Sequence, residues 1–182
     1  MTDSLPPVVI VRHAEKPAHG GPHGVDHHGN QTEHGLTPRG WTRTGALAVR
    51  FAHSGAEDDP IPRPSRVYAT ATDAHHASDR PRMTATPIAQ RLDVHLHDHH
   101  GRGSEAQLAA EILAAGEPTL IVWDHGHIPT LARAFPMAAA GDIPESWPDD
   151  RFDLFWVLVP DADGHYSLRI LAQELLAGDA NT

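Results

Sequence analysis

Four side chains of this sequence have the chemistry needed to bind and transfer a phosphoryl group: Arg12, His13, Arg80 and His125. A neutral imidazole can attack phosphorus and form a covalent phosphohistidine, which divides one difficult step into two easier ones. Arginine suits the surrounding cradle because its planar guanidinium matches pairs of phosphate oxygens and stays charged. Fixed positive charge around the equatorial oxygens is the other requirement of phosphoryl transfer. Two histidines with two arginines in reach would therefore make a phosphoryl-transfer site.

The elements that must position these side chains are short strands of apolar, mostly β-branched residues, as in buried parallel sheets. They are predicted at Val8–Val11, Val67–Ala69 and Thr119–Trp123. The segments that follow them are Arg12-His13, Thr70–Arg80 and Asp124-His125-Gly126. In open α/β sheets, ligands bind beyond the carboxyl ends of the strands. We therefore expect the three segments to meet at one edge of the sheet.

Helical patterns alternate with these strands. The first helix is predicted to begin at Thr37-Pro38, with Thr37 as N-cap, and the second at Pro81, broken or kinked by Pro87. Further helices are predicted at Glu105–Ala115, capped by Ser104, and at Pro129–Phe135, and further strands at Val94–Leu96, Phe155–Val159 and, at an edge, Tyr166–Leu171. This alternation predicts a three-layer α/β/α sandwich around a mostly parallel sheet. A length of 182 residues with 40% hydrophobic content suits a single domain over residues 1–182.

Composition narrows the classes of partner. A formal net charge of −10 disfavours nucleic acid and anionic membranes, and no apolar run approaches the roughly 20 residues of a membrane span. The run Val8–Val11 is too short for a signal peptide, so we expect a cytoplasmic protein. The sequence has no cysteine, which excludes disulfides and thiolate chemistry. The expected partners are a small phosphorylated substrate or a phosphoprotein.

Four segments of the sequence resemble motifs of the histidine phosphatases and phosphoglycerate mutases, and they occur in the same order as in that family. They are Val9–Glu15, which resembles the Arg-His-Gly-Glu signature, Leu36–Gly40 (Leu-Thr-x-x-Gly), Arg80–Ala85 (Arg-Ala-x-Gln-Thr-Ala) and Leu120–Gly126, an apolar strand ending in His-Gly. The resemblance implies a phosphoglycerate mutase-like fold and a phosphatase that works without metal or other cofactor. It also implies that His13 is the nucleophile, that Arg12 and Arg80 bind the phosphoryl group, and that His125 donates to a phosphoryl oxygen.

The sequence departs from the family pattern in three places. Ala14 replaces the glycine after the nucleophile, and the segment Thr70–Arg80 is longer than usual and contains His75-His76. The expected glutamate that protonates the leaving group is also replaced, because Leu96-His97-Asp98 stands in its place. Asp98 is the predicted proton donor and Glu105 the second choice. A general acid is worth roughly 10²–10⁴-fold to such a reaction.

Two other functions compete with this interpretation. The long segment Pro17–Gly35 includes the histidines of His19–His34, of which His19, His23, His27 and His28 could bind zinc, nickel or copper. The chain would then be a histidine-rich metal-binding protein, although the spacing of these histidines does not fix a tetrahedral site. The second alternative is a catalytically inactive phosphate-binding module on the same fold. Outside the four central residues, Arg39 and Arg82 are expected on helix surfaces, and His127 either lines the pocket or faces solvent.

Overall fold

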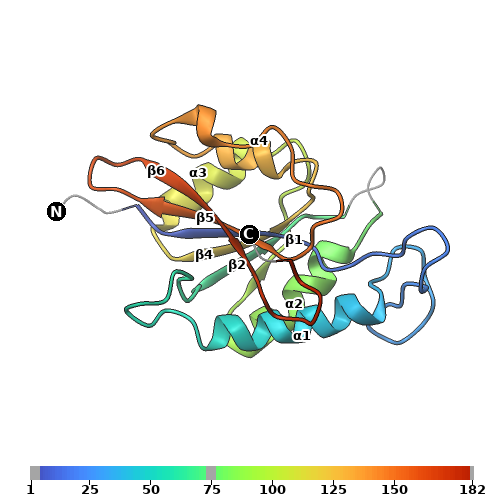
Figure 1. The fold of residues 1–182 in the computed structure, drawn as a ribbon. Coiled ribbons are helices and arrows are strands. Elements are labelled where there is room, and N and C mark those ends of the chain that lie inside the picture. The colour runs from blue at the N-terminus through green and yellow to red at the C-terminus, as the bar shows by residue number, and fades with distance from the viewer. Residues whose placement is uncertain (1–4, 73–76, 181–182) are drawn as a thin grey trace.

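The computed structural model describes residues 5–72 and 77–180 (Figure 1). Within these residues the strands are β1 (Val8–Arg12), β2 (Arg66–Ala69), β3 (Leu96–His97), β4 (Thr119–Trp123), β5 (Leu154–Pro160) and β6 (Tyr166–Ala172). The helices are α1 (Pro38–Ala52), α2 (Arg80–Leu92), α3 (Glu105–Ala115) and α4 (Ile128–Arg133), with one 3-10 turn, η1 (Ala140–Asp142). None of the helices in the described residues is long and apolar enough to cross a membrane.

The strands of the described residues form one mixed sheet in the order β3-β2-β4-β1-β5-β6. Neighbours among β3, β2, β4 and β1 are parallel, whereas β5 runs antiparallel to β1 and β6 antiparallel to β5. The predicted mostly parallel sheet is thus confirmed, and β6 lies at an edge as expected. Because β2, β4 and β1 are adjacent and parallel, the three segments that follow them leave the sheet at the same edge.

The sheet lies between two layers of helices. Figure 1 shows α1 and α2 on one face and α3 and α4 on the other. Alternate residues of the central strands point to opposite faces, as the two-residue period of a strand requires. Val9 and Leu120 belong to the core on the α1–α2 side, whereas Ile10 and Ile121 belong to the core on the α3–α4 side. This arrangement confirms the predicted three-layer sandwich.

The first turn of α1 is pressed against the chain that follows β1. Thr37 is the N-cap, as predicted, and its Oγ1 accepts a hydrogen bond from Gly40 N–H at 3.1 Å. A Cβ atom at Gly40 would lie 2.5 Å from the backbone oxygen of Glu15. The glycine of the Leu-Thr-x-x-Gly motif is therefore needed for this close approach. The contact fixes the path of the chain just beyond His13.

Two predicted elements differ in the structure. Helix α2 runs from Arg80 through Pro87 to Leu92 as one helix, so Pro87 does not break it. Buried residues on both sides of the proline, including Ala85 and Ile88, pack α2 into the core, and this packing outweighs the lost backbone hydrogen bond. Strand β3 contains Leu96 and His97 and begins later than the predicted Val94–Leu96.

The other predicted bounds agree with the structure to within one residue, apart from the end of α4, which differs by two. That helix covers Ile128–Arg133 where Pro129–Phe135 was predicted. Ser104 is the N-cap residue of α3, but its side chain makes no capping hydrogen bond and donates to the Gly101 carbonyl at 2.6 Å. His75 and His76 lie outside the described residues.

The segment Pro17–Gly35 contains no named helix or strand, but hydrogen bonds hold it near α1. Val25 exchanges two backbone hydrogen bonds with Leu36, at 2.8 and 3.1 Å. The Val25 carbonyl also accepts from the indole N–H of Trp41 at 3.1 Å. The long segment is thus folded back on the start of α1.

Candidate active site

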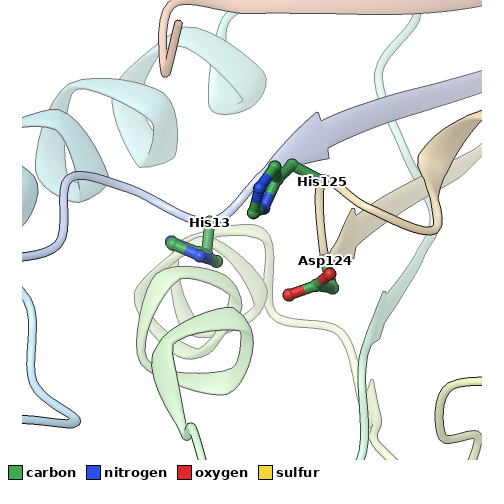
Figure 2. A group of neighbouring side chains, drawn as sticks. All are labelled: His13, Asp124 and His125. Atoms are coloured by element: carbon green, nitrogen blue, oxygen red, sulfur yellow. The ribbon is translucent and has the colours of Figure 1, made fainter. Parts of the chain in front are cut away.

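The carboxyl ends of β1 and β4 bring His13, Asp124 and His125 together (Figure 2). Arg12 pairs with Trp123 in the parallel ladder, so His13 and Asp124 are the next residues on the two strands. One ligand atom from each of the three side chains lies within 4.8 Å of the other two. We call these three residues the strand-end group. Their convergence was expected from the order of strand and segment in the sequence.

His13 is held in the chemical form that a nucleophile requires. Its side chain is buried, with 3% exposure, and its Nδ1 lies 2.7 Å from the Ala14 carbonyl oxygen. Because a carbonyl oxygen can only accept, Nδ1 must carry the proton, which leaves a lone pair on Nε2. Burial lowers the pKa of His13 to about 3, and the nearby charges of Arg12 and Arg80 act in the same direction. The imidazole is therefore neutral at physiological pH.

Arg12 lies beside the strand-end group with part of its guanidinium unoccupied. Its Nη1 donates to the backbone carbonyls of Asp149 at 2.6 Å and Arg151 at 3.2 Å, and its guanidinium carbon lies 3.9 Å from the centre of the Phe152 ring. Burial lowers the pKa of Arg12 to about 10, so the side chain stays charged. Among the described residues, buried Nε and Nη2 of Arg12 have no hydrogen-bond partner. Two such donors suit the paired oxygens of an anion.

Arg80, the first residue of α2, joins the site to the segment Pro17–Gly35. Its Nε donates to the Gly35 carbonyl at 3.1 Å, Nη2 donates to the Glu33 carbonyl, and Nη1 donates to the Ser78 hydroxyl at 3.3 Å. A guanidinium carries five N–H donors, and these contacts with described residues use three of them. Burial lowers the pKa of Arg80, and the charge of Asp124 opposes that shift. Arg80 is therefore within electrostatic reach of the strand-end group.

Thr84 links the segment after His13 to the start of α2. Its hydroxyl is fully buried and accepts a hydrogen bond from Ala14 N–H at 3.0 Å. The same hydroxyl donates to the backbone carbonyl of Arg80 at 2.9 Å. The threonine of the Arg80–Ala85 motif thus fixes the segment that follows β1 relative to the helix that carries Arg80.

His125 has one nitrogen toward Asp149 and one without a partner. Its Nε2 lies 3.3 Å from the Asp149 carboxylate, whose side chain is 93% exposed. Its buried Nδ1 makes no hydrogen bond to any of the described residues. Burial lowers the pKa of His125, and the charge of Arg12 lowers it further. A hydrogen-bond partner for Nδ1 would be supplied by an anion in the site.

Sequence reasoning gave no role to Asp124, which the structure places in the strand-end group. The carboxylate accepts from Arg102 Nη2 at 2.8 Å and from Gly126 N–H at 3.1 Å. Burial alone would raise the pKa of Asp124, but Arg102 and His125 outweigh it, and the pKa lies below its usual value. Asp124 is therefore ionised at neutral pH. Its position directly before His125, at the end of a predicted strand, could have identified Asp124 as a site residue from the sequence.

Lys16 and Arg102 were also missed. The side chain of Lys16 is exposed, and its pKa is lowered by partial burial and by the charges of Arg12 and Arg80. Lys16 thus adds a positive charge at the rim of the site. Its nearness to His13 in the sequence was a signal. Arg102 lies in an irregular segment before α3, and no motif marked it.

The two carboxylates predicted as proton donors lie in different surroundings. Asp98 follows β3 at the same sheet edge as the strand-end group, and its side chain is 45% exposed. Its carboxylate lies 3.9 Å from Arg82, and among the described residues no contact joins it to His13 or His125. Glu105 is buried, accepts from the Trp123 indole at 3.3 Å, and lies 3.1 Å from Nδ1 of His127.

Three further residues considered from the sequence are occupied by structural contacts. Arg82 is 48% exposed and forms a salt bridge with Asp79 at 2.7 Å. Arg39 bonds to the carboxylates of Glu15 and Asp179, at 3.2 and 3.0 Å. His127 contacts Glu105 and is 39% exposed, so it partly faces solvent.

Neither a family model nor a curated protein sequence matches the chain. Solved structures do match. A mycobacterial glucosyl-3-phosphoglycerate phosphatase is 14% identical, with a TM-score of 0.57, over 91% of this chain and 97% of that chain. A phosphoserine phosphatase from Entamoeba histolytica is 15% identical, with a TM-score of 0.57, over 94% and 100%. A protein described as mycobacterial hydrolase 1 is 13% identical, with a TM-score of 0.56, over 97% and 99%.

Each of these alignments covers nearly the whole of both chains, so the likeness concerns the entire arrangement of sheet and helices. At these sequence identities it establishes the fold. The same proteins bear out the resemblance drawn from the four sequence motifs. The chain therefore shares the fold of these structures, the phosphoglycerate mutase-like α/β/α sandwich expected from the sequence.

Proposed function

We propose that the protein is a metal-independent phosphatase that hydrolyses phosphomonoesters, or phosphohistidine, through a phosphohistidine intermediate on His13. The observation that carries this proposal is the state of His13, a buried neutral imidazole whose tautomer leaves Nε2 unprotonated. The two unpaired donors of Arg12 beside it support an anionic substrate. Two of the similar structures are phosphatases by name, which supports the same class of reaction.

The proposed first step transfers the phosphoryl group to His13. The phosphate oxygens are held by Nε and Nη2 of Arg12, by Arg80 and by His125. His13 Nε2 then forms a bond to phosphorus while the bond to the leaving oxygen breaks. The proton on Nδ1 stays in its hydrogen bond to the Ala14 carbonyl. That bond stabilises the positive charge that the ring gains as phosphorus is attached.

The leaving oxygen needs a proton, and Asp98 is the proposed donor. Asp98 follows β3 and so lies at the same sheet edge as the strand-end group, and its carboxylate is not held by a short salt bridge. Asp124 is nearer to His13 but is kept ionised by Arg102, so it is unsuited to donate a proton. Glu105 is engaged by Trp123 and His127. In the second step a water attacks phosphorus, its proton passes to the Asp98 carboxylate, and the bond to Nε2 breaks.

The test is to capture the intermediate. Wild-type protein is mixed with nitrophenyl phosphate and quenched in base, where phosphohistidine survives, and the phosphorylated residue is located by mass spectrometry. We expect the phosphoryl group on His13 and release of phosphate with and without a chelator. His13→Ala should lower the rate to below a few per cent of wild type while circular dichroism remains unchanged. His53→Ala, which alters an exposed histidine at the end of α1, is the matched control.

Two results would contradict the proposal. A His13→Ala variant that keeps more than a few per cent of the wild-type rate would exclude His13 as the nucleophile. Phosphate binding without release, even in a single turnover, would instead indicate the phosphate-binding module. A panel of phosphorylated metabolites and a phosphohistidine peptide, screened for phosphate release with His13→Ala as the blank, then identifies the substrate class.

A further inference from the structure

A second group of two histidines and a carboxylate lies between the segment after β3 and helix α3. Nε2 of His99 and Nε2 of His100 lie 3.0 and 2.7 Å from the same oxygen, Oε2 of Glu111. One ligand atom from each side chain lies within 4.8 Å of the other two. We call these three residues the helix-side group. None of them takes part in the reaction proposed above.

The group has the atoms that zinc prefers. Imidazole nitrogen and carboxylate oxygen are ordinary zinc ligands, and an ion with bonds of about 2.0–2.2 Å holds tetrahedral ligand atoms about 3.3–3.6 Å apart. The present separations of 2.7 and 3.0 Å would need to open by less than about 1 Å to admit an ion. Both Nε2 atoms now donate a proton to the carboxylate, because an ionised carboxylate can only accept. Zinc bound at Nε2 would require each neutral imidazole to carry its proton on Nδ1 instead.

The carboxylate of Glu111 is oriented by a further contact. The hydroxyl of Tyr68 donates to Oε1 at 2.9 Å, which turns Oε2 toward the two histidines. Hydrogen bonds from histidines and tyrosine lower the pKa of Glu111 to about 2, with His100 the largest cause, so the carboxylate keeps its charge. A hydrogen bond to the second oxygen of a ligating carboxylate is a common way to fix a metal ligand.

Exposure favours an open site with solvent as a further ligand. The side chain of His99 is 55% exposed, that of Glu111 is 35% exposed and that of His100 is 15% exposed. Three protein ligands with an open position are a recurrent zinc arrangement. By contrast, none of His19, His23, His27 and His28 belongs to such a cluster in the described part of the chain. The rings of His27 and His28 lie against each other there, with centres 3.9 Å apart and planes tilted by 42°.

We propose that His99, His100 and Glu111 bind one zinc ion. The ion joins the segment before α3 to the helix itself. That segment also holds the His100 carbonyl, which accepts from Ala71 N–H at 2.7 Å, and Arg102, which bonds to Asp124. Zinc therefore stabilises the part of the chain that carries Arg102 to the strand-end group. Because the ion binds the folded protein, its presence raises the melting temperature.

Zinc binding is measured by titrating metal-free protein in competition with a chromophoric chelator. Glu111→Gln and the double variant His99→Asn/His100→Asn should each lose one zinc equivalent or bind it more than about 10²-fold more weakly. That loss exceeds the 10- to 100-fold effect of removing an outer partner, which is the effect expected for Tyr68→Phe. His27→Asn/His28→Asn, which changes two adjacent exposed histidines, should keep the equivalent. His125→Asn should also keep it, because His125 belongs to the strand-end group.

The melting temperature gives an independent readout. Zinc should raise it in wild type and in His27→Asn/His28→Asn but not in Glu111→Gln, whose metal-free circular dichroism should match wild type. X-ray absorption of the zinc-loaded protein should show two imidazole nitrogens in the first shell. The proposal is overturned if wild type binds no zinc at micromolar concentration, or if the helix-side variants retain the same number of zinc equivalents at the same affinity. It is also overturned if the His27/His28 variant loses the equivalent instead.

Discussion

The strand-end group and the helix-side group contain the same set of three side chains, two histidines and one carboxylate, yet their surroundings differ. Around the strand-end group lie Arg12, Arg80 and Lys16, and Arg102 binds its carboxylate. Around the helix-side group, the described contacts to Glu111 come from neutral or titratable rings. The first arrangement attracts an anion and the second a cation. The contrast teaches that the neighbouring charges, and not the ligand set alone, decide what a histidine pair binds.

The largest expected effect comes from removing a donor of the anion site. Arg80→Ala and His125→Ala should each lower kcat/KM for nitrophenyl phosphate by roughly 10²–10³-fold, the usual loss for one preorganised oxyanion donor. Arg82→Ala is the matched control from the same helix. It should cost much less because its guanidinium is bound to Asp79. Equal losses at Arg80 and Arg82 would place Arg82 in the phosphate site and break the contrast.

A somewhat smaller effect separates the carboxylates. Asp98→Asn should lower kcat/KM for an alkyl phosphate by about 10²-fold, since an alkoxide needs protonation, and should barely affect kcat/KM for nitrophenyl phosphate, because kcat/KM contains only the steps up to departure of the leaving group. The ratio of the two rates at a pH near 6 is the measurement. If the ratio is the same in wild type and Asp98→Asn, the proton donor is another residue and Glu105 is the next to test. A structural aspartate would slow both substrates alike.

The smallest expected effect tests the burial of the strand-end group. The folded pKa of His13 is lowered from 6.5 to about 3, so the unfolded chain binds a proton in that range that the folded chain does not. Above pH 6.5 the His13 imidazole is neutral in both the folded and the unfolded chain, so its burial carries no cost from protonation. As the pH falls from 6.5 toward 3, the free energy of unfolding decreases by up to about 1.4 kcal/mol per pH unit. In His13→Gln, the free energy of unfolding measured with urea should therefore depend less steeply on pH between 6.5 and 5 than in wild type.

The control for this pH effect is His53→Gln, because His53 is exposed in the folded protein. Its unfolding free energy should change with pH as steeply as that of wild type. A His13→Gln variant with the wild-type slope would mean that His13 is protonated in the folded protein at pH 5 to 6.5. The imidazole would then be unable to act as a nucleophile in that range.

Much of the fold followed from local patterns. The continuous apolar runs before Arg12 and Asp124 could be identified as buried strands, and strand ends of a parallel sheet meet by geometry. The convergence of His13 and His125 could therefore be predicted. The continuation of α2 through Pro87 could not be predicted, because backbone propensity is a local property, whereas the packing that carries α2 through the proline depends on the rest of the core.

Contacts from irregular segments could not be predicted in the same way. Arg102 bonds to Asp124 from a turn before α3. The course of that turn is set by contacts with other parts of the domain, and no regular spacing of residues in the sequence indicates it. The histidines around His99 were visible as a cluster in the sequence, but Glu111 was not linked to them. The two positions come together only because the segment after β3 passes beside α3.

The hydroxyl of Thr84 has a mechanical consequence. It holds Ala14, which is 70 positions away in the sequence, and at the same time the backbone of Arg80. A shift of Arg80 on ligand binding would thus be transmitted through the Thr84 oxygen to Ala14, the residue next to His13. The Thr84 hydroxyl therefore couples the position of Arg80 to that of the segment containing His13 and Ala14. Thr84→Val, which keeps the shape but loses both bonds, would let the two parts move independently.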